Sequence, residues 1–125
     1  MKKLVAESYV LLLWAGFLLA FRSIHALHRH VRMARTQAGH PGLRSGPEQL
    51  CHAMDLACVF YPKPVRCLQR SAATTLLLRR HGVGAELVIG AQLLPFRSHA
   101  WVECGGAVVN DKPYMREMYQ VLEHC

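Results

Sequence analysis

The chain has 125 residues, of which 52% are hydrophobic, and its 15 Lys and Arg against 8 Asp and Glu give a net charge of +7. This length supports one domain with a single core, and the hydrophobic content excludes an intrinsically disordered chain. The five cysteines include no C-x-x-C pair, which argues against a zinc ribbon or a thioredoxin-type redox site. Their odd number favours a reducing, cytoplasmic setting over a secreted disulfide scaffold.

The first part of the chain, residues 1–46, is predicted to be a helical segment followed by a basic loop. Residues from about Leu4 to Met33 have a helical pattern, apolar first and then basic and amphipathic. The apolar run from Tyr9 to Phe21 follows two lysines and resembles a signal peptide, but its 13 residues fall short of the roughly 20 that cross a bilayer. We therefore expect a buried or membrane-surface helix, with a signal or anchor segment as the alternative.

A basic patch follows the apolar run. Between residues 22 and 44 there is no acidic residue to offset the positive charges of Arg22, Arg29, Arg32, Arg35 and Arg44. Such a patch can bind an acidic peptide, an anionic lipid or a nucleic acid, and a solvated basic face fits it equally well. His25 and His28 would share a helix face, but without a nearby carboxylate or cysteine we expect no metal site there.

The second part, residues 47–125, is predicted to be the functional core. After a loop at Ala38–Gly42, the spacing Ser45-Gly46-Pro47-Glu48 matches a capping box that begins a helix running to about Phe60. Pro62-Lys63-Pro64 then ends that helix.

A further helix is predicted from Cys67 through Leu78 to a cap at Gly82. Its first turn holds a thiol, and the positive end of the helix dipole favours the nucleophilic thiolate there. Arg79 and Arg80 are interpreted as cations that suit the helix C-terminus. The remaining cysteines are interpreted as small buried apolar residues, namely Cys51, Cys58, Cys104 and Cys125.

The pattern then changes from helical to strand period. A strand is predicted from Ala85 to Ile89, ending at Gly90, and a hairpin from Ser98–Cys104 and Ala107–Asn110 around Gly105-Gly106. Residues 113–123 are expected to form a final helix or an irregular tail. Helices followed by a small antiparallel sheet predict the α+β class.

Three residues at the ends or edges of different elements point to chemistry: Cys67, His99 and Asp111. Each alone is compatible with a structural role as a buried thiol, a core histidine or a turn carboxylate. Together they have the order and setting of a papain-like triad, with a nucleophile, a base that also protonates the leaving group, and a carboxylate that orients the base. The Cys67 N–H is the expected oxyanion donor, and Trp101 is interpreted as core instead of a substrate platform.

Three stretches of the chain resemble the transglutaminase-like leader peptidase of lasso-peptide biosynthesis. They are Cys67-Leu68-Gln69-Arg70-Ser71, His99-Ala100-Trp101-Val102-Glu103 and Asn110-Asp111. The resemblance covers roughly Pro62 to Tyr119. It implies a transglutaminase-like, papain-like core in which Cys67, His99 and Asp111 are the catalytic triad, with no metal or cofactor. It implies cleavage of the leader from a ribosomally made precursor.

The resemblance also implies partners. An ATP-dependent macrolactam synthetase, the lasso cyclase, would act on the cleaved precursor, and a separate winged-helix-type protein would present the leader, because residues 1–60 show no strands for a fused module. The chain thus resembles the stand-alone peptidase of split systems, active in the cytoplasm, with no nucleic acid partner and with weak membrane association as a side expectation. The alternatives are a non-catalytic scaffold subunit and a transglutaminase-like acyl transferase. Ser71 and Thr74-Thr75 make the catalytic helix more polar than the resemblance leads one to expect.

Overall fold

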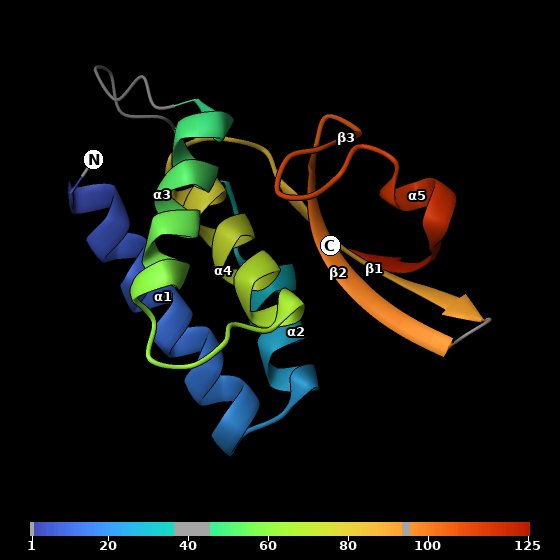
Figure 1. The fold of residues 1–125 in the computed structure, drawn as a ribbon, viewed down its shortest axis with the longest axis horizontal. Helices are drawn as coiled ribbons and strands as arrows, with labels where there is room; N and C mark the ends of the chain where they lie inside the picture. Colours follow the sequence, from blue (N-terminus) through green and yellow to red (C-terminus); the bar gives the residue numbers. More distant parts are fainter. Residues whose placement is uncertain (1, 37–45, 94–95) are drawn as a thin grey trace.

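A computed structural model describes residues 2–36, 46–93 and 96–125, in which helices pack beside a four-stranded antiparallel sheet (Figure 1). The strand order is β3-β2-β1-β4. The predicted α+β class is confirmed. The elements in chain order are α1 (Lys2–Phe21), α2 (Ile24–Met33), α3 (Pro47–Phe60), α4 (Cys67–Arg80), β1 (Glu86–Leu93), β2 (Phe96–Cys104), β3 (Ala107–Val108), α5 (Met115–Met118) and β4 (Gln120–His124).

The predicted continuous helical stretch at the N-terminus is two helices. The break lies at Ser23, which has extended backbone and whose Oγ accepts a hydrogen bond from the Ala26 N–H at 3.1 Å. A serine side chain stabilises a helix start in this way, so α2 begins at Ile24 as a separate helix.

Helix α3 ends at Phe60, as predicted, but it does not begin with the predicted capping box. Its N-cap is Gly46, without a side-chain cap, and Pro47 occupies the first turn. Because a residue before proline is driven to extended backbone, Gly46 takes the cap conformation one residue after the expected Ser45. Ser45 and the loop predicted at 38–42 lie outside the described residues.

Helix α4 begins at Cys67 and ends before a left-handed Gly82, as predicted, with φ of 82° at the glycine. Ten of its residues are buried, because α1 and α3 contact it from one direction and β2 from another. The polar residues of the helix are satisfied inside this core. Thr74 and Thr75 donate to carbonyls one turn earlier, at 2.7 and 2.9 Å.

Arg79 does not act as a simple cation at the helix end, which corrects the sequence interpretation. Its side chain is 7% exposed, and its guanidinium donates to four backbone carbonyls from other parts of the chain. Arg80 alone stays at the surface, where it pairs with Glu7 at 2.7 Å. The carbonyls bound by Arg79 are those of Val31, Ala34, Ala85 and Cys125.

The sheet is longer than predicted at β1. That strand runs through Gly90 to Leu93, and Gly90 lies opposite His99 in the antiparallel register. A Cβ at Gly90 would lie 2.8 Å from the Trp101 ring and 2.9 Å from Tyr119 Cβ, so glycine is needed there for packing, not for ending the strand. The β2–β3 hairpin forms around Gly105-Gly106, both with positive φ, although β3 has only two residues.

The C-terminal region predicted as a helix or tail contains a short helix, α5, followed by the strand β4. This strand pairs antiparallel with the free edge of β1, with an irregularity between Ile89 and Gly90. The pairing partner lies some thirty residues away in the chain, and local sequence period does not reveal such a contact. Strand β4 was therefore missed.

Candidate active site

Cys67 is the first residue of α4, and its position relative to the sheet is fixed by one hydrogen bond. Ser71, one helical turn further along α4, donates through Oγ to the Ala100 carbonyl at 3.0 Å. This bond ties α4 to β2 at Ala100, the residue that follows His99 in the strand. The half-buried Cys67 also packs against a cluster of buried core residues that includes Ala72 and Ala100.

His99 and Asp111 form a direct pair. His99 Nε2 lies 2.6 Å from Asp111 Oδ2, and both side chains are about one-quarter exposed, at 25% and 24%. Because Asp111 uses Nε2, Nδ1 is the ring nitrogen left to exchange a proton with a thiol or a leaving group. The structure thus brings together two of the three predicted site residues.

Two aromatic rings fix the plane of the His99 imidazole. Tyr119 stacks on it with centroids 5.4 Å apart and planes at 23°, and Trp101 stacks with centroids 6.2 Å apart at 25°. Trp101 is fully buried, as expected of a core residue, and its Nε1 donates to Glu103 at 2.8 Å. Sequence reasoning missed Tyr119, because it precedes the unpredicted strand β4.

Asn110 links the loop that carries Asp111 to two elements. Its Oδ1 accepts from the Val102 N–H at 2.8 Å, and its Nδ2 donates to Ser71 Oγ at 3.1 Å. Arg70 adds a third link by donating to the Asn110 carbonyl at 3.2 Å. Ser71, which makes the helix more polar than expected, is therefore one of the groups that position Asp111. The Asn-Asp sequence at the end of a predicted strand was the signal in the sequence that pointed to Asn110.

The local environment holds Asp111 as a carboxylate. Burial raises its pKa, but the hydrogen bonds from His99 and from the Lys112 N–H, with the charges of His99 and Arg70, outweigh burial and lower the pKa overall. An ionised Asp111 favours a proton on Nε2 of His99 and leaves Nδ1 as the acceptor.

The four remaining cysteines have a different character from a reactive thiol. Burial raises the pKa of Cys51 to about 11 and also raises the pKa values of Cys58, Cys104 and Cys125. All five cysteines are free thiols, and a raised pKa keeps these four protonated near neutral pH. The interpretation as buried residues is confirmed for Cys51, whereas Cys58, Cys104 and Cys125 are half-buried.

Cys67 and His99 are placed on packed elements without a direct bond. Within residues 2–36, 46–93 and 96–125 the Cys67 thiol makes no hydrogen bond, and these residues contain no cluster of His, Cys, Asp and Glu suited to a metal. The sequence showed no carboxylate close to His28, but the fold brings Glu123 Oε2 to 3.4 Å from His28 Nε2. The structure therefore orders the His99–Asp111 pair and leaves the Cys67 thiol without a hydrogen-bond partner among the described residues.

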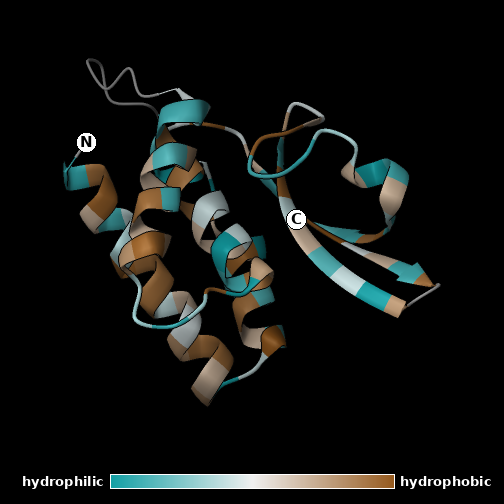
Figure 2. Cartoon of the chain, in the orientation of Figure 1, coloured by the Kyte–Doolittle hydropathy of each residue, from teal (hydrophilic) through white to brown (hydrophobic). Residues whose placement is uncertain are grey.

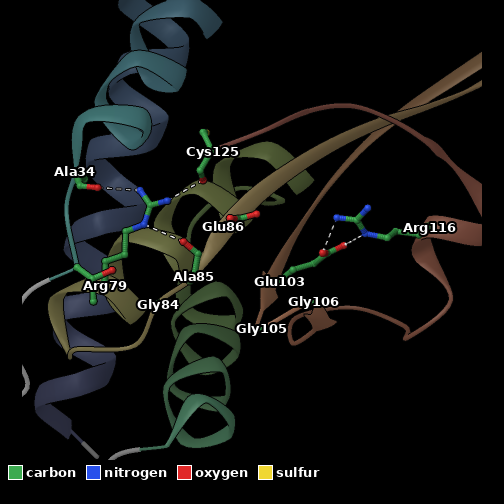
Figure 3. A pocket seen from close by; sticks show the side chains of 11 residues that line it. Ala34, Arg79, Gly84, Ala85, Glu86, Glu103, Gly105, Gly106, Arg116 and Cys125 are labelled. Carbon is green, nitrogen blue, oxygen red and sulfur yellow. Dashed lines mark hydrogen bonds and ion pairs between the residues drawn. The ribbon is translucent and has the colours of Figure 1, made fainter.

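Two cavities differ in their relation to this site. A cavity of about 480 Å³ lies by the Gly105-Gly106 turn (Figure 3). Both arginines that line it are already hydrogen-bonded within the protein, Arg79 to backbone carbonyls and Arg116 to Glu103. A second cavity, of about 280 Å³, lies between α1 and the residues around the start of α4, and Cys67 is not part of its lining. Its lining includes Gly16, Tyr61, Lys63, Arg66 and Gln69.

The fold and the site define a class of protein in which a cysteine begins a buried helix, a histidine lies on the adjoining antiparallel sheet, and an aspartate from a following loop pairs with that histidine. The model of the transglutaminase-like superfamily matches residues 9–124, and the chain belongs to this superfamily. Over 56 residues the chain is 46% identical to the microcin J25-processing protein McjB of Escherichia coli. The matched stretch is 45% of this chain and 27% of that relative. No solved structure matches the chain significantly.

Proposed function

We propose that the chain is a cysteine peptidase that removes the leader from a ribosomally made lasso-peptide precursor. The observation that carries this proposal is the 2.6 Å pair between Asp111 and His99, which lies on the strand that α4 contacts through Ser71, one turn after Cys67. The similarity to a microcin-processing protein supports the substrate class.

In the proposed reaction, the Cys67 thiolate attacks the scissile carbonyl carbon while His99 carries the thiol proton on Nδ1. The resulting oxyanion accepts a hydrogen bond from the Cys67 N–H. No side chain caps the start of α4, so none competes for this N–H. His99 gives its proton to the departing amine as the C–N bond breaks, leaving a thioester. Water, deprotonated by His99, then hydrolyses the thioester and restores the thiol.

Asp111 keeps His99 in the tautomer and orientation that this cycle needs. Its hydrogen bond to Nε2 and the stacked rings of Trp101 and Tyr119 hold the imidazole before substrate arrives. Catalytic hydrogen bonds are often long without substrate and tighten in the Michaelis complex. In the proposal, Cys67 and His99 come within hydrogen-bond distance of one another when substrate is bound.

The proposal includes partners for the peptidase. A separate winged-helix-type recognition protein presents the leader, and an ATP-dependent cyclase uses the cleaved product in the cytoplasm. Residues 47–125 carry the three reacting side chains, and residues 1–46 supply the helices α1 and α2 that pack on α4. Activity without the recognition protein is expected to be weak.

The test is intact-mass analysis of a lasso precursor incubated with its recognition protein and the chain. Loss of the leader with wild type and with Cys58→Ala, but not with Cys67→Ala, would support a peptidase that uses Cys67. Cys58 is a matched control because it is a half-buried thiol on α3. An unchanged precursor would favour a scaffold subunit, and a product joined to an added amine would favour acyl transfer.

A further inference from the structure

Helix α1 is apolar on all sides, but the protein covers only one of them. Figure 2 shows hydrophobic residues along most of its length. Its inner side contributes Leu4, Leu12, Ala15 and Leu18 to the core. A helix that is hydrophobic all round is normally enclosed on all sides, so the outer side of α1 is expected to have a cover of its own.

The outer side of α1 is a continuous apolar stripe. Its members are spaced by four and three residues, which places them along one face, and between Ala6 and Phe21 this exposed face holds no charge. Val10, Leu13, Phe17 and Phe21 are between 46% and 74% exposed, and the rings of Phe17 and Phe21 lie 5.0 Å apart. The stripe consists of Ala6, Val10, Leu13, Phe17, Ala20 and Phe21.

The acidic residue of α1 is kept away from this stripe. Glu7 is turned toward the end of α4, where it pairs with Arg80 at 2.7 Å and with His81 at 3.1 Å. This arrangement keeps the Glu7 carboxylate away from the stripe, where its negative charge would repel an anionic surface.

Cations lie at both ends of the stripe. Lys2 and Lys3 precede it and Arg22 follows it, all exposed and none in an ion pair within the described part of the chain. Lys63, also exposed, lines a cavity together with Ala20. An apolar face with cationic ends complements acyl chains beneath anionic headgroups, whereas a purely apolar partner would gain nothing from these charges.

The helix is long enough to cross a bilayer by length and composition. Crossing would, however, pull its inner side chains out of the core formed with α3 and α4. We infer that α1 lies in the plane of an anionic membrane surface, with the apolar stripe buried among the lipids and the rest of the domain on the aqueous side.

The test is co-sedimentation of the full chain with vesicles of phosphatidylcholine alone or mixed with phosphatidylglycerol. Binding is expected with the anionic vesicles and is expected to weaken as salt is raised. Replacing Lys2 and Lys3 by Gln is expected to lower partitioning by about fivefold per lysine. The double variant Leu13→Gln/Phe17→Gln, whose side chains are exposed, is expected to lower it by at least about tenfold.

Phe96→Gln is the matched control, because Phe96 is 73% exposed but lies on β2, outside the stripe. It is expected to leave partitioning unchanged. Failure to bind anionic vesicles, or equal binding by the Leu13/Phe17 variant, would overturn the inference. So would a dimer in light scattering that this variant dissociates, since a second copy would then cover the stripe.

Discussion

Asp111 couples the ordering of the His99 ring to pH. Its pKa is lowered in the folded protein, so its carboxylate stabilises the fold fully above the ordinary Asp pKa of about 4 and loses that contribution as pH falls below it. We expect the melting temperature of wild type to fall more steeply than that of Asp111→Asn as pH is lowered below about 4. Identical slopes in a series of melts over this range would contradict the role given to the His99–Asp111 pair.

Asn110 acts on the site through Asp111, since it touches Val102 and Ser71 and not the reacting atoms. Asn110→Ala leaves a partly buried N–H unpaired, and we expect a loss of about 1–3 kcal/mol in urea unfolding. Because the Asp111 loop loses its anchor, kcat for leader removal should fall more than KM changes. Asn110→Asp, which keeps an acceptor for Val102, should recover part of the stability. Equal kcat in wild type and Asn110→Ala would rule out a positioning role.

At the residue scale, the three candidate site residues could be proposed from the sequence, but the contacts that support them could not. Cys67 begins α4 as predicted, and His99 and Asp111 meet. The role of Tyr119 could not be assigned, and the Asn-Asp sequence drew attention to Asn110 without revealing its partners, since both roles depend on contacts between separate segments. Arg79 was misinterpreted for the same reason, because its carbonyl partners come from three separate places: the end of α2, Ala85 and Cys125.

At the element scale, Arg79 connects α4 to α2, β1 and the end of β4. Arg79→Leu would remove its hydrogen bonds to four carbonyls and leave those of Ala34 and Ala85 without the donor that Arg79 supplies, so we expect a loss of at least about 2 kcal/mol in chemical unfolding. Arg80→Leu is the neighbouring control. Its 54% exposed side chain forms a surface pair with Glu7, and removing it should cost about 1 kcal/mol or less. Similar costs for both variants would contradict the connecting role.

Gly90 is the point where two strands and the rings around His99 approach most closely. A methyl group there would press on Trp101 and Tyr119, so we expect Gly90→Ala to destabilise by about 1–3 kcal/mol and to lower activity. Gly84→Ala is the control, because a Cβ at Gly84 meets nothing within 4 Å. Equal melting temperatures for the two variants would show that the packing at Gly90 is looser than described.

Helices were predicted better than strands. The periods of α3 and α4, with proline and glycine at their ends, placed them closely, whereas the break at Ser23 depended on one side-chain cap. The length of β1 and the existence of β4 depend on each other, because each supplies the other's hydrogen-bond partners. Such mutual pairing leaves little trace in either segment alone.

At the scale of the whole molecule, the fold gives one cysteine different surroundings from the other four. Cys67 lies at an uncapped helix start, while burial raises the pKa values of the rest. The α+β class could be predicted from the order of helical and strand periods. The approach of α4 to β2 could not, because it depends on the Ser71–Ala100 and Asn110–Ser71 hydrogen bonds.

The most direct measurement is the rate of iodoacetamide alkylation at each cysteine, followed by peptide mass mapping near neutral pH. If His99 activates Cys67, Cys67 should react at least about tenfold faster than the other four, and His99→Ala should remove most of that difference. His124→Ala, at an exposed histidine of β4, should leave the pattern unchanged. A Cys67 that reacts no faster than Cys58, or that is indifferent to His99→Ala, would contradict the catalytic pairing.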